Sequence, residues 1–271
     1  MSPKMLFIVN VLIPILIAPI YFVLARYIRK IKPLRLLIMG EKTYQYAFWI
    51  FLLFGIFFLG RPFQILLGGH PVPLIVSSIR EFIMIGLLTP CVLAGLLNQL
   101  FYDSEFPEYI SNSIFGFCIL LGIIFVYCNI KSIGGSHQIF EYHFLGMNVI
   151  ANDGNWFMSG NNKKYLIFLF AIRLISPVIL MLGISILAFL KASIYPKNSL
   201  YSNLPMKYFL EGLAVLIFVI SILFTGVMAY VWNFQTQWYY FGALLAGIIG
   251  YIALKIPPRN FVVQNELHVR K

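Results

Sequence analysis

Three ionisable residues lie well inside long apolar runs of this sequence: Arg80 and Glu81, which are adjacent, and Arg173. At 1.5 Å per helical residue, all three lie on the order of 10 Å from the nearer end of their run. Buried charges are costly in a membrane unless they face protein, water or a ligand. We therefore expect Glu81 to pair with Arg173 or Arg80. The remaining guanidinium would then meet an anionic or hydrogen-bond-accepting ligand.

Polar residues near the neighbouring run ends extend this candidate ligand site. Arg61 and Gln64 lie just beyond the outer end of the second run and His70 follows in the next loop, so these three would rim the outer mouth. Ser77 and Ser78 precede the charged pair by about one helical turn and would add hydroxyl groups. Two alternatives stay open: a structural ion pair that binds nothing, or arginines that snorkel to the lipid headgroups.

The elements that must position these residues are membrane helices. The 271 residues are 61% hydrophobic and 11% charged, whereas soluble domains have about 45–50% and 25%. Seven apolar runs approach the ~20 residues that a helix needs to cross a bilayer. We expect an all-α bundle of seven transmembrane helices that forms one domain over residues 1–271. The runs are Met5–Tyr27, Tyr44–Gly60, Leu74–Phe101, Ile110–Ile130, Tyr165–Leu190, Tyr208–Trp232 and Trp238–Leu254.

Basic residues between the runs predict the orientation. Six lysines and arginines lie at or soon after the end of the first run, whereas Lys4 alone precedes it. Cytoplasmic loops carry the excess of basic residues, so we expect the N-terminus outside and the tail, residues 255–271, inside. The net charge of +11 then reflects topology and contact with membrane lipids rather than nucleic-acid binding.

The longest predicted outer segment, residues 131–164, shows partial alternation of apolar and polar residues. Asp153-Gly154 lies between apolar-containing flanks and is a typical hairpin turn. We expect a short β-hairpin here that covers the outer mouth as a lid.

The final run combines small residues with aromatic residues at its start. Small side chains recur every four residues at Gly242, Ala246 and Gly250, which favours close approach of another helix of the same bundle. Tyr239 and Tyr240 are typical of the aromatic belt at a membrane interface.

The sequence lacks the residues that several kinds of membrane chemistry require. Lys255 lies at the inner edge of the seventh run, so a retinal Schiff base is not expected. The four histidines lie outside the apolar runs, which excludes an intramembrane haem pair. His137, His143, Glu141 and Asp153 match no standard metal spacing. The sequence also lacks Walker, HExxH and GxSxG motifs, so we expect no cofactor and no metal site.

The chain resembles a known class of membrane region in its predicted N-out topology and in two segments, GRPFQILLGGHPVPL and IGLLTPCVLAGLLNQLFYD. The layout resembles the seven-helix sensor regions found ahead of bacterial histidine kinases and diguanylate cyclases. This resemblance implies a receptor-like sensory module of a bacterial inner or plasma membrane that binds a small anionic or amphipathic ligand from outside. The sequence after the last run has no room for a kinase or cyclase domain. Output would therefore pass through a cytoplasmic partner at the tail, unless the output domain lies outside this chain.

Two other function classes stay open. A membrane enzyme acting on a lipid or lipid-linked phosphate would hold phosphate with the same arginines and move protons with Glu81, His137 or His143. A transporter is less favoured, because the sequence has no internal repeat and only one carboxylate, Glu81, well inside the runs for ion coupling.

Overall fold

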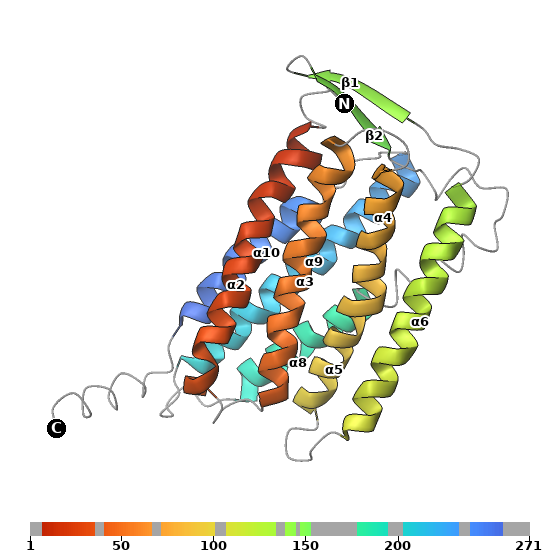
Figure 1. Ribbon diagram of the computed structural model, residues 1–271. Coiled ribbons are helices and arrows are strands. Elements are labelled where there is room, and N and C mark those ends of the chain that lie inside the picture. Colours follow the sequence, from red (N-terminus) through yellow and green to blue (C-terminus); the bar gives the residue numbers. More distant parts are fainter. Residues whose placement is uncertain are drawn as a thin grey trace.

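The computed structural model describes residues 7–35, 41–66, 72–100, 107–133, 139–144, 147–152, 178–194, 203–232 and 239–256. These residues form helices and one pair of strands (Figure 1). The elements are η1 (Ile8–Leu12), α2 (Ile13–Arg35), α3 (Glu41–Leu66), α4 (Val72–Phe82), η2 (Ile83–Leu88), α5 (Thr89–Leu100), α6 (Glu108–Ile133), β1 (Ile139–Phe144), β2 (Met147–Asn152), α8 (Leu180–Ile194), α9 (Leu204–Trp232) and α10 (Tyr239–Lys255).

Five helical segments among the described residues are long and apolar enough to cross a membrane. Two of them combine consecutive elements, because η1 continues into α2 and α4 continues through η2 into α5. The shorter helices α8 and α10 are also apolar. These helices indicate a membrane protein, as the sequence predicted. The count of seven spans and the orientation stay predictions. The five segments are Ile8–Lys30, Lys42–Leu66, Ile75–Asn98, Glu108–Tyr127 and Leu204–Thr225.

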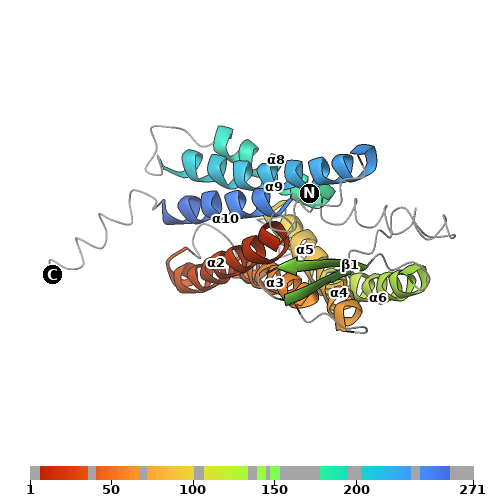
Figure 2. The same cartoon turned by 90° about the horizontal axis from the view of Figure 1, so that it is seen from above.

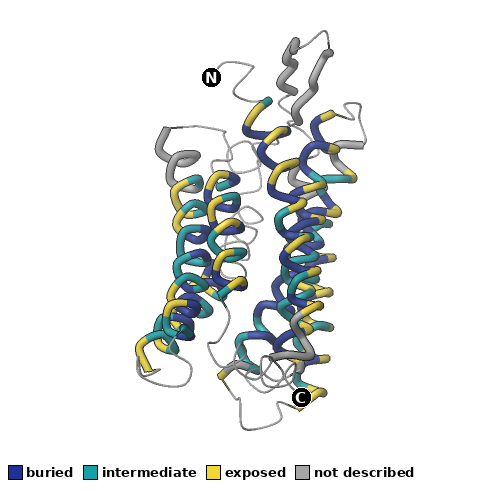
Figure 3. The backbone as a smooth tube through the Cα atoms, turned by 90° about the vertical axis from the view of Figure 1, so that its left-hand side faces the viewer, coloured by how far each residue is buried: buried dark blue, intermediate teal, exposed yellow. Residues whose placement is uncertain are grey.

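The helices form two groups that meet where α10 contacts α2 and where α5 contacts α8. Helix α2 packs on α3, and α9 packs on both α8 and α10. Helix α10 also contacts α2, so it links the two groups (Figure 2). Buried residues lie mainly on the faces that the helices turn toward one another, and exposed residues on the outer faces (Figure 3). This is the pattern expected of helices that pack together inside lipid.

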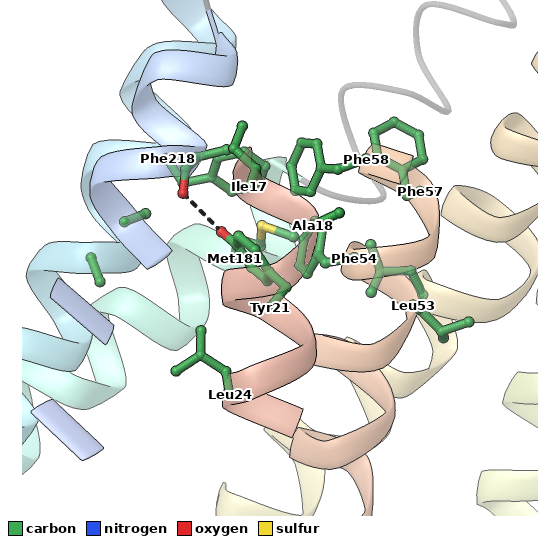
Figure 4. Close-up of a cluster of buried hydrophobic side chains, with 14 of the residues drawn as sticks. Ile17, Ala18, Tyr21, Leu24, Leu53, Phe54, Phe57, Phe58, Met181 and Phe218 are labelled. Atoms are coloured by element: carbon green, nitrogen blue, oxygen red, sulfur yellow. Dashed lines mark hydrogen bonds between the residues drawn. The ribbon is translucent and has the colours of Figure 1, made fainter. Parts of the chain in front are cut away.

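Aromatic side chains dominate the centre of the bundle. The ring of Tyr21 lies 5.5 Å from that of Phe54 and 5.4 Å from that of Phe58, between centroids (Figure 4). Phe218 of α9 packs edge-on against Phe54. The buried Tyr21 hydroxyl donates a hydrogen bond of 3.2 Å to the carbonyl oxygen of Ala243 in α10. This bond fixes α2 against α10.

Both π-helical segments end just before a proline. Segment η1 precedes Pro14, and η2 precedes Pro90. Proline has no amide hydrogen and interrupts the regular α-helical bonding pattern. The wider turn of η2 ends where the Thr89 amide bonds the carbonyl of Met84, which also accepts a 2.8 Å bond from the Thr89 hydroxyl. The prolines thus explain why each helix widens where it does.

Strands β1 and β2 form an antiparallel pair in which Phe144 lies opposite Met147. The described strands pair the alternating segment with the segment before Asp153-Gly154. The sequence had predicted a turn at that dipeptide, and this turn stays a prediction. Asp153-Gly154 itself lies outside the described residues. The hairpin lies at the end of the bundle where α2 begins and α3 ends, and β2 contacts α3 (Figure 1).

Candidate functional site

Two arginines are enclosed at the hairpin end of the bundle. Arg61 comes from the last turns of α3 and is 2% exposed, and Arg80 comes from α4 and is 7% exposed. Both donate to the same atom, the side-chain oxygen of Gln64. The distance is 3.2 Å from Nη1 of Arg61 and 2.7 Å from Nη1 of Arg80. One amide oxygen therefore lies between two guanidinium groups.

Arg61 is held from the neighbouring helix by Asn10. The Asn10 Oδ1 atom accepts bonds of 3.3 Å from Nε and 2.8 Å from Nη2 of Arg61. Asn10 lies in η1, the π-helical turn at the start of α2, and is itself buried. The first helix therefore contributes directly to the polar site.

Arg80 links three helices through neutral oxygen atoms. Its Nε donates to the carbonyl oxygen of Phe57 at 3.0 Å, and its Nη2 donates to the hydroxyl of Tyr240 at 3.2 Å. The guanidinium carbon also lies 4.5 Å from the centre of the Phe57 ring, a cation–π contact. With Gln64, these contacts join α4 to α3 and α10.

Gly60 makes room for the Arg80 side chain. A Cβ atom built on Gly60 would lie 2.8 Å from both Cγ and Cδ of Arg80. The methylene groups of Arg80 therefore run across the α3 backbone at this glycine, and the guanidinium reaches Gln64 beyond it. A larger residue at position 60 would displace the arginine.

The structure describes only some of the residues predicted to form the charged cluster. Glu81 is buried, at 9% exposed, but Arg80 is bound by neutral oxygens and forms no ion pair with Glu81 in the described part of the chain. Arg173 and His70 lie outside the described residues, so the Glu81–Arg173 pair stays a prediction. Ser77 is half-buried. Ser78 is buried, and its hydroxyl has no hydrogen-bond partner among the described residues.

The sequence correctly predicted that Arg61, Gln64 and Arg80 share one site, but two of the predictions about this site were wrong. Arg61 and Gln64 were expected at an open rim, whereas both are buried. Tyr240 was expected at the membrane interface, whereas it is fully buried and binds Arg80. Asn10 was missed, although a polar residue inside the first apolar run was a usable signal.

The site is a buried hydrogen-bonded network around two arginines, in which the described acceptors of Arg80 are neutral oxygens. A guanidinium has five N–H donors in a fixed fork that matches carboxylates and phosphates. Three donors of Arg80 have acceptors in these contacts. In a low-dielectric surrounding, the attraction of an anion to such a group is strong.

No protein-family model, curated protein or solved structure matches this chain. The fold and the site therefore carry the functional argument. Together they define a helical membrane protein with two arginines buried side by side near one end of its bundle.

Proposed function

We propose that this protein is a receptor-like sensory module of a bacterial-type plasma membrane. It would cross the membrane seven times, with the N-terminus outside and the C-terminal tail in the cytoplasm. The two shorter apolar helices support the count, since α8 and α10 together with the five long segments make seven. The resemblance to seven-helix sensor regions supports the sensory assignment.

The distribution of charge supports the orientation. Arg26, Arg29 and Lys30 are exposed near the end of α2, and Lys255 is exposed at the end of α10. These ends lie opposite the end that carries the hairpin (Figure 1). Basic residues favour the cytoplasmic side, so the Arg61–Arg80 network would lie on the outer side.

The observation that carries the proposal is the position of Arg80 between α3, α4 and α10. An anionic ligand that enters from outside would compete with Gln64, Phe57 and Tyr240 for its donors. Because Tyr240 is at the start of α10, loss of its bond to Arg80 would free that helix end. A ligand can shift such an equilibrium only through its different affinities for the two arrangements.

Helix α10 provides the route to the cytoplasmic side. At its far end, the ammonium group of Lys255 lies 5.5 Å from the ring centre of Tyr27 in α2 and 5.3 Å from that of Tyr251. A shift of α10 against α2 would change these contacts next to the tail. The tail is where we place the cytoplasmic output partner.

The test measures a distance between α2 and α10. Val23 and Ile252 are about half exposed on these helices and would be replaced by cysteine, in a background without native cysteines, to carry spin labels. Acetate, succinate and inorganic phosphate would be added at constant ionic strength. We expect at least one anion to change the distance distribution, and the change to be lost in Arg80→Gln. An anion that binds without altering this distance would contradict the sensory function.

A further inference from the structure

We infer that an anionic phospholipid binds along the α2–α10 seam, the line where these helices meet at Tyr27, Tyr251 and Lys255. The seam lies at the end of the bundle opposite the hairpin (Figure 1). The lipid phosphate would lie among Arg26, Lys30 and Lys255, and an acyl chain would run along exposed apolar residues further into the bundle. Only the choice of the cytoplasmic leaflet rests on the proposed function, through its orientation.

The first argument is the order of side chains on α2. Val23 is about half exposed, and Arg26 and Lys30 are exposed one and two turns closer to the helix end. With the half-buried Tyr27, they follow the spacing i, i+3, i+4, i+7 of one helical face. An apolar surface therefore passes into a positively charged one along this face, which is the order that an acyl chain and its phosphate require.

Helix α10 repeats this order at the same end. Ile248 and Ile252 are about half exposed, and Lys255 is exposed about one turn beyond Ile252. Tyr251 completes the same spacing, and the centre of its ring lies 6.4 Å from that of Tyr27. The matching faces of the two helices therefore adjoin at this pair of tyrosines, and one lipid molecule can contact both helices.

The second argument is the balance of charge at the seam. Neither α2 nor α10 contains an acidic residue, and the nearest acidic residues along the chain are Glu41 and Glu266. The ammonium group of Lys255 lies 5.5 and 5.3 Å from the ring centres of Tyr27 and Tyr251. These cation–π contacts hold the lysine in place but leave its charge without an opposite charge from either helix.

Lys191, at the same end of the bundle, is a lysine of the same kind with a different counter-charge. Its ammonium group lies 5.7 Å from the ring centre of Tyr208. Lys191 also interacts electrostatically with Glu211, whose Oε1 atom lies 3.5 Å from Nζ of Lys207. The lysines of α8 and α9 are therefore balanced in part by a carboxylate of the protein. The cations of the seam would take their counter-charge from the membrane.

The apolar residues favour a lipid over an acidic protein as the source of that negative charge. Val23 and Ile252 lie inside apolar helices, on the side of the cations that faces the middle of the bundle. An acyl chain reaches this depth, whereas a soluble protein at the membrane surface does not. Clusters of basic residues beside membrane helices bind anionic headgroups, so one phospholipid satisfies both parts of the seam.

The experiment measures lipid binding to the purified protein in dodecyl maltoside by native mass spectrometry. We expect phosphatidylglycerol to bind more tightly than phosphatidylcholine with the same acyl chains. Lys255→Gln and Arg26→Gln should each weaken phosphatidylglycerol binding about fivefold in apparent Kd, because each removes one cation near the phosphate. Both variants should bind phosphatidylcholine as the wild type does. Lys255→Arg keeps the charge and should keep the affinity.

Lys191→Gln is the matched control. It also removes a lysine that lies over a tyrosine ring, but one that has Glu211 beside it, so the affinity for phosphatidylglycerol should not change. Glycerol 3-phosphate, added in excess, tests whether the phosphate alone is enough for binding. We expect it not to displace phosphatidylglycerol, since it has no acyl chain to lie along Val23 and Ile252.

Three results would overturn the inference. The two lipids could bind equally well, which would leave the cations of the seam to an acidic protein. Lys191→Gln could weaken binding as much as Lys255→Gln, which would mean that net charge and not the seam is important. Glycerol 3-phosphate could displace the lipid, which would make a soluble phosphate the occupant. None of these measurements involves Arg80, so their failure is distinct from a missing anion response in the spin-label experiment.

Discussion

The course of the Arg80 side chain depends on the absence of a side chain at Gly60. The Cγ and Cδ atoms of Arg80 occupy the space that a Cβ on Gly60 would need. Because α3 and α4 approach at this point, the arginine can cross the α3 backbone and still reach Gln64. A single glycine thus determines where a buried charge is placed.

We expect Gly60→Ala to destabilise the protein by about 1–3 kcal/mol, the usual cost of overpacking. The added Cβ would lie 2.8 Å from two carbons of Arg80, so the guanidinium must leave Gln64 or the helices must separate. Thermal unfolding in detergent measures the effect. Gly250→Ala is the control, because nothing lies within 4 Å of a Cβ built there. An equal loss in both variants would mean that the glycine backbone, and not the space for Arg80, is important.

Residue-level prediction from the sequence worked where the residue type was unusual for its surroundings. Arg61, Gln64 and Arg80 stand out because polar residues near the ends of apolar runs need partners. Tyr240 did not stand out, since tyrosine is common at membrane interfaces. Its burial depends on the packing of α10 on α9 and α2, which brings the Tyr240 ring against Phe58 of α3, and no local pattern contains this arrangement.

At the scale of the helices, small residues set which elements meet. Gly242 of α10 packs directly against Ser221 of α9, and Gly247 lies against Ile20 and Tyr21 of α2. The spacing of small residues in the last run predicted such a close approach within the bundle, and these contacts confirm it. Gly250 is different, because nothing lies within 4 Å of its position. The sequence pattern therefore identified the packing helix but not every contacting residue.

Helix α6 contacts η2, α4 and α5, and a glycine pair lies at its contact with η2. A Cβ on Gly122 would lie 3.0 Å from the Cα of Gly86, in the π-helical segment η2. Backbone so close to backbone leaves no side chain that can move aside. Most of α6 otherwise faces outward, since only 22% of the residues in its most apolar stretch are buried.

We expect Gly122→Leu to separate α6 from η2 and to lower the stability by about 1–3 kcal/mol. The measurement is again thermal unfolding in detergent. Gly116→Leu gives the matched control on the same helix, because nothing lies within 4 Å of a Cβ at that position and leucine suits a lipid-facing surface. Equal stability of the two variants would show that the Gly86–Gly122 contact does not hold α6.

At the scale of the whole molecule, hydropathy was enough to predict a helical membrane protein, because lipid requires backbone hydrogen bonds to be made within each helix. It was not enough to predict that β1 pairs with β2. Several segments between residues 131 and 164 alternate in polarity, and pairing between strands is decided by register rather than by a single turn dipeptide.

The orientation is the whole-molecule property on which the proposed function depends most. If the hairpin end lies outside, Leu66→Cys at the end of α3 should react with a membrane-impermeant maleimide in intact cells. Tyr109→Cys and Ile194→Cys, at the opposite end and highly exposed, should react only after the membrane is permeabilised. All three would be made in a background without native cysteines, which itself serves as the unlabelled control. The reverse labelling pattern would place Arg61 and Arg80 toward the cytoplasm. Their ligand would then come from inside the cell, and the exposed lysines and arginines near the other end would contradict the rule that basic residues stay inside.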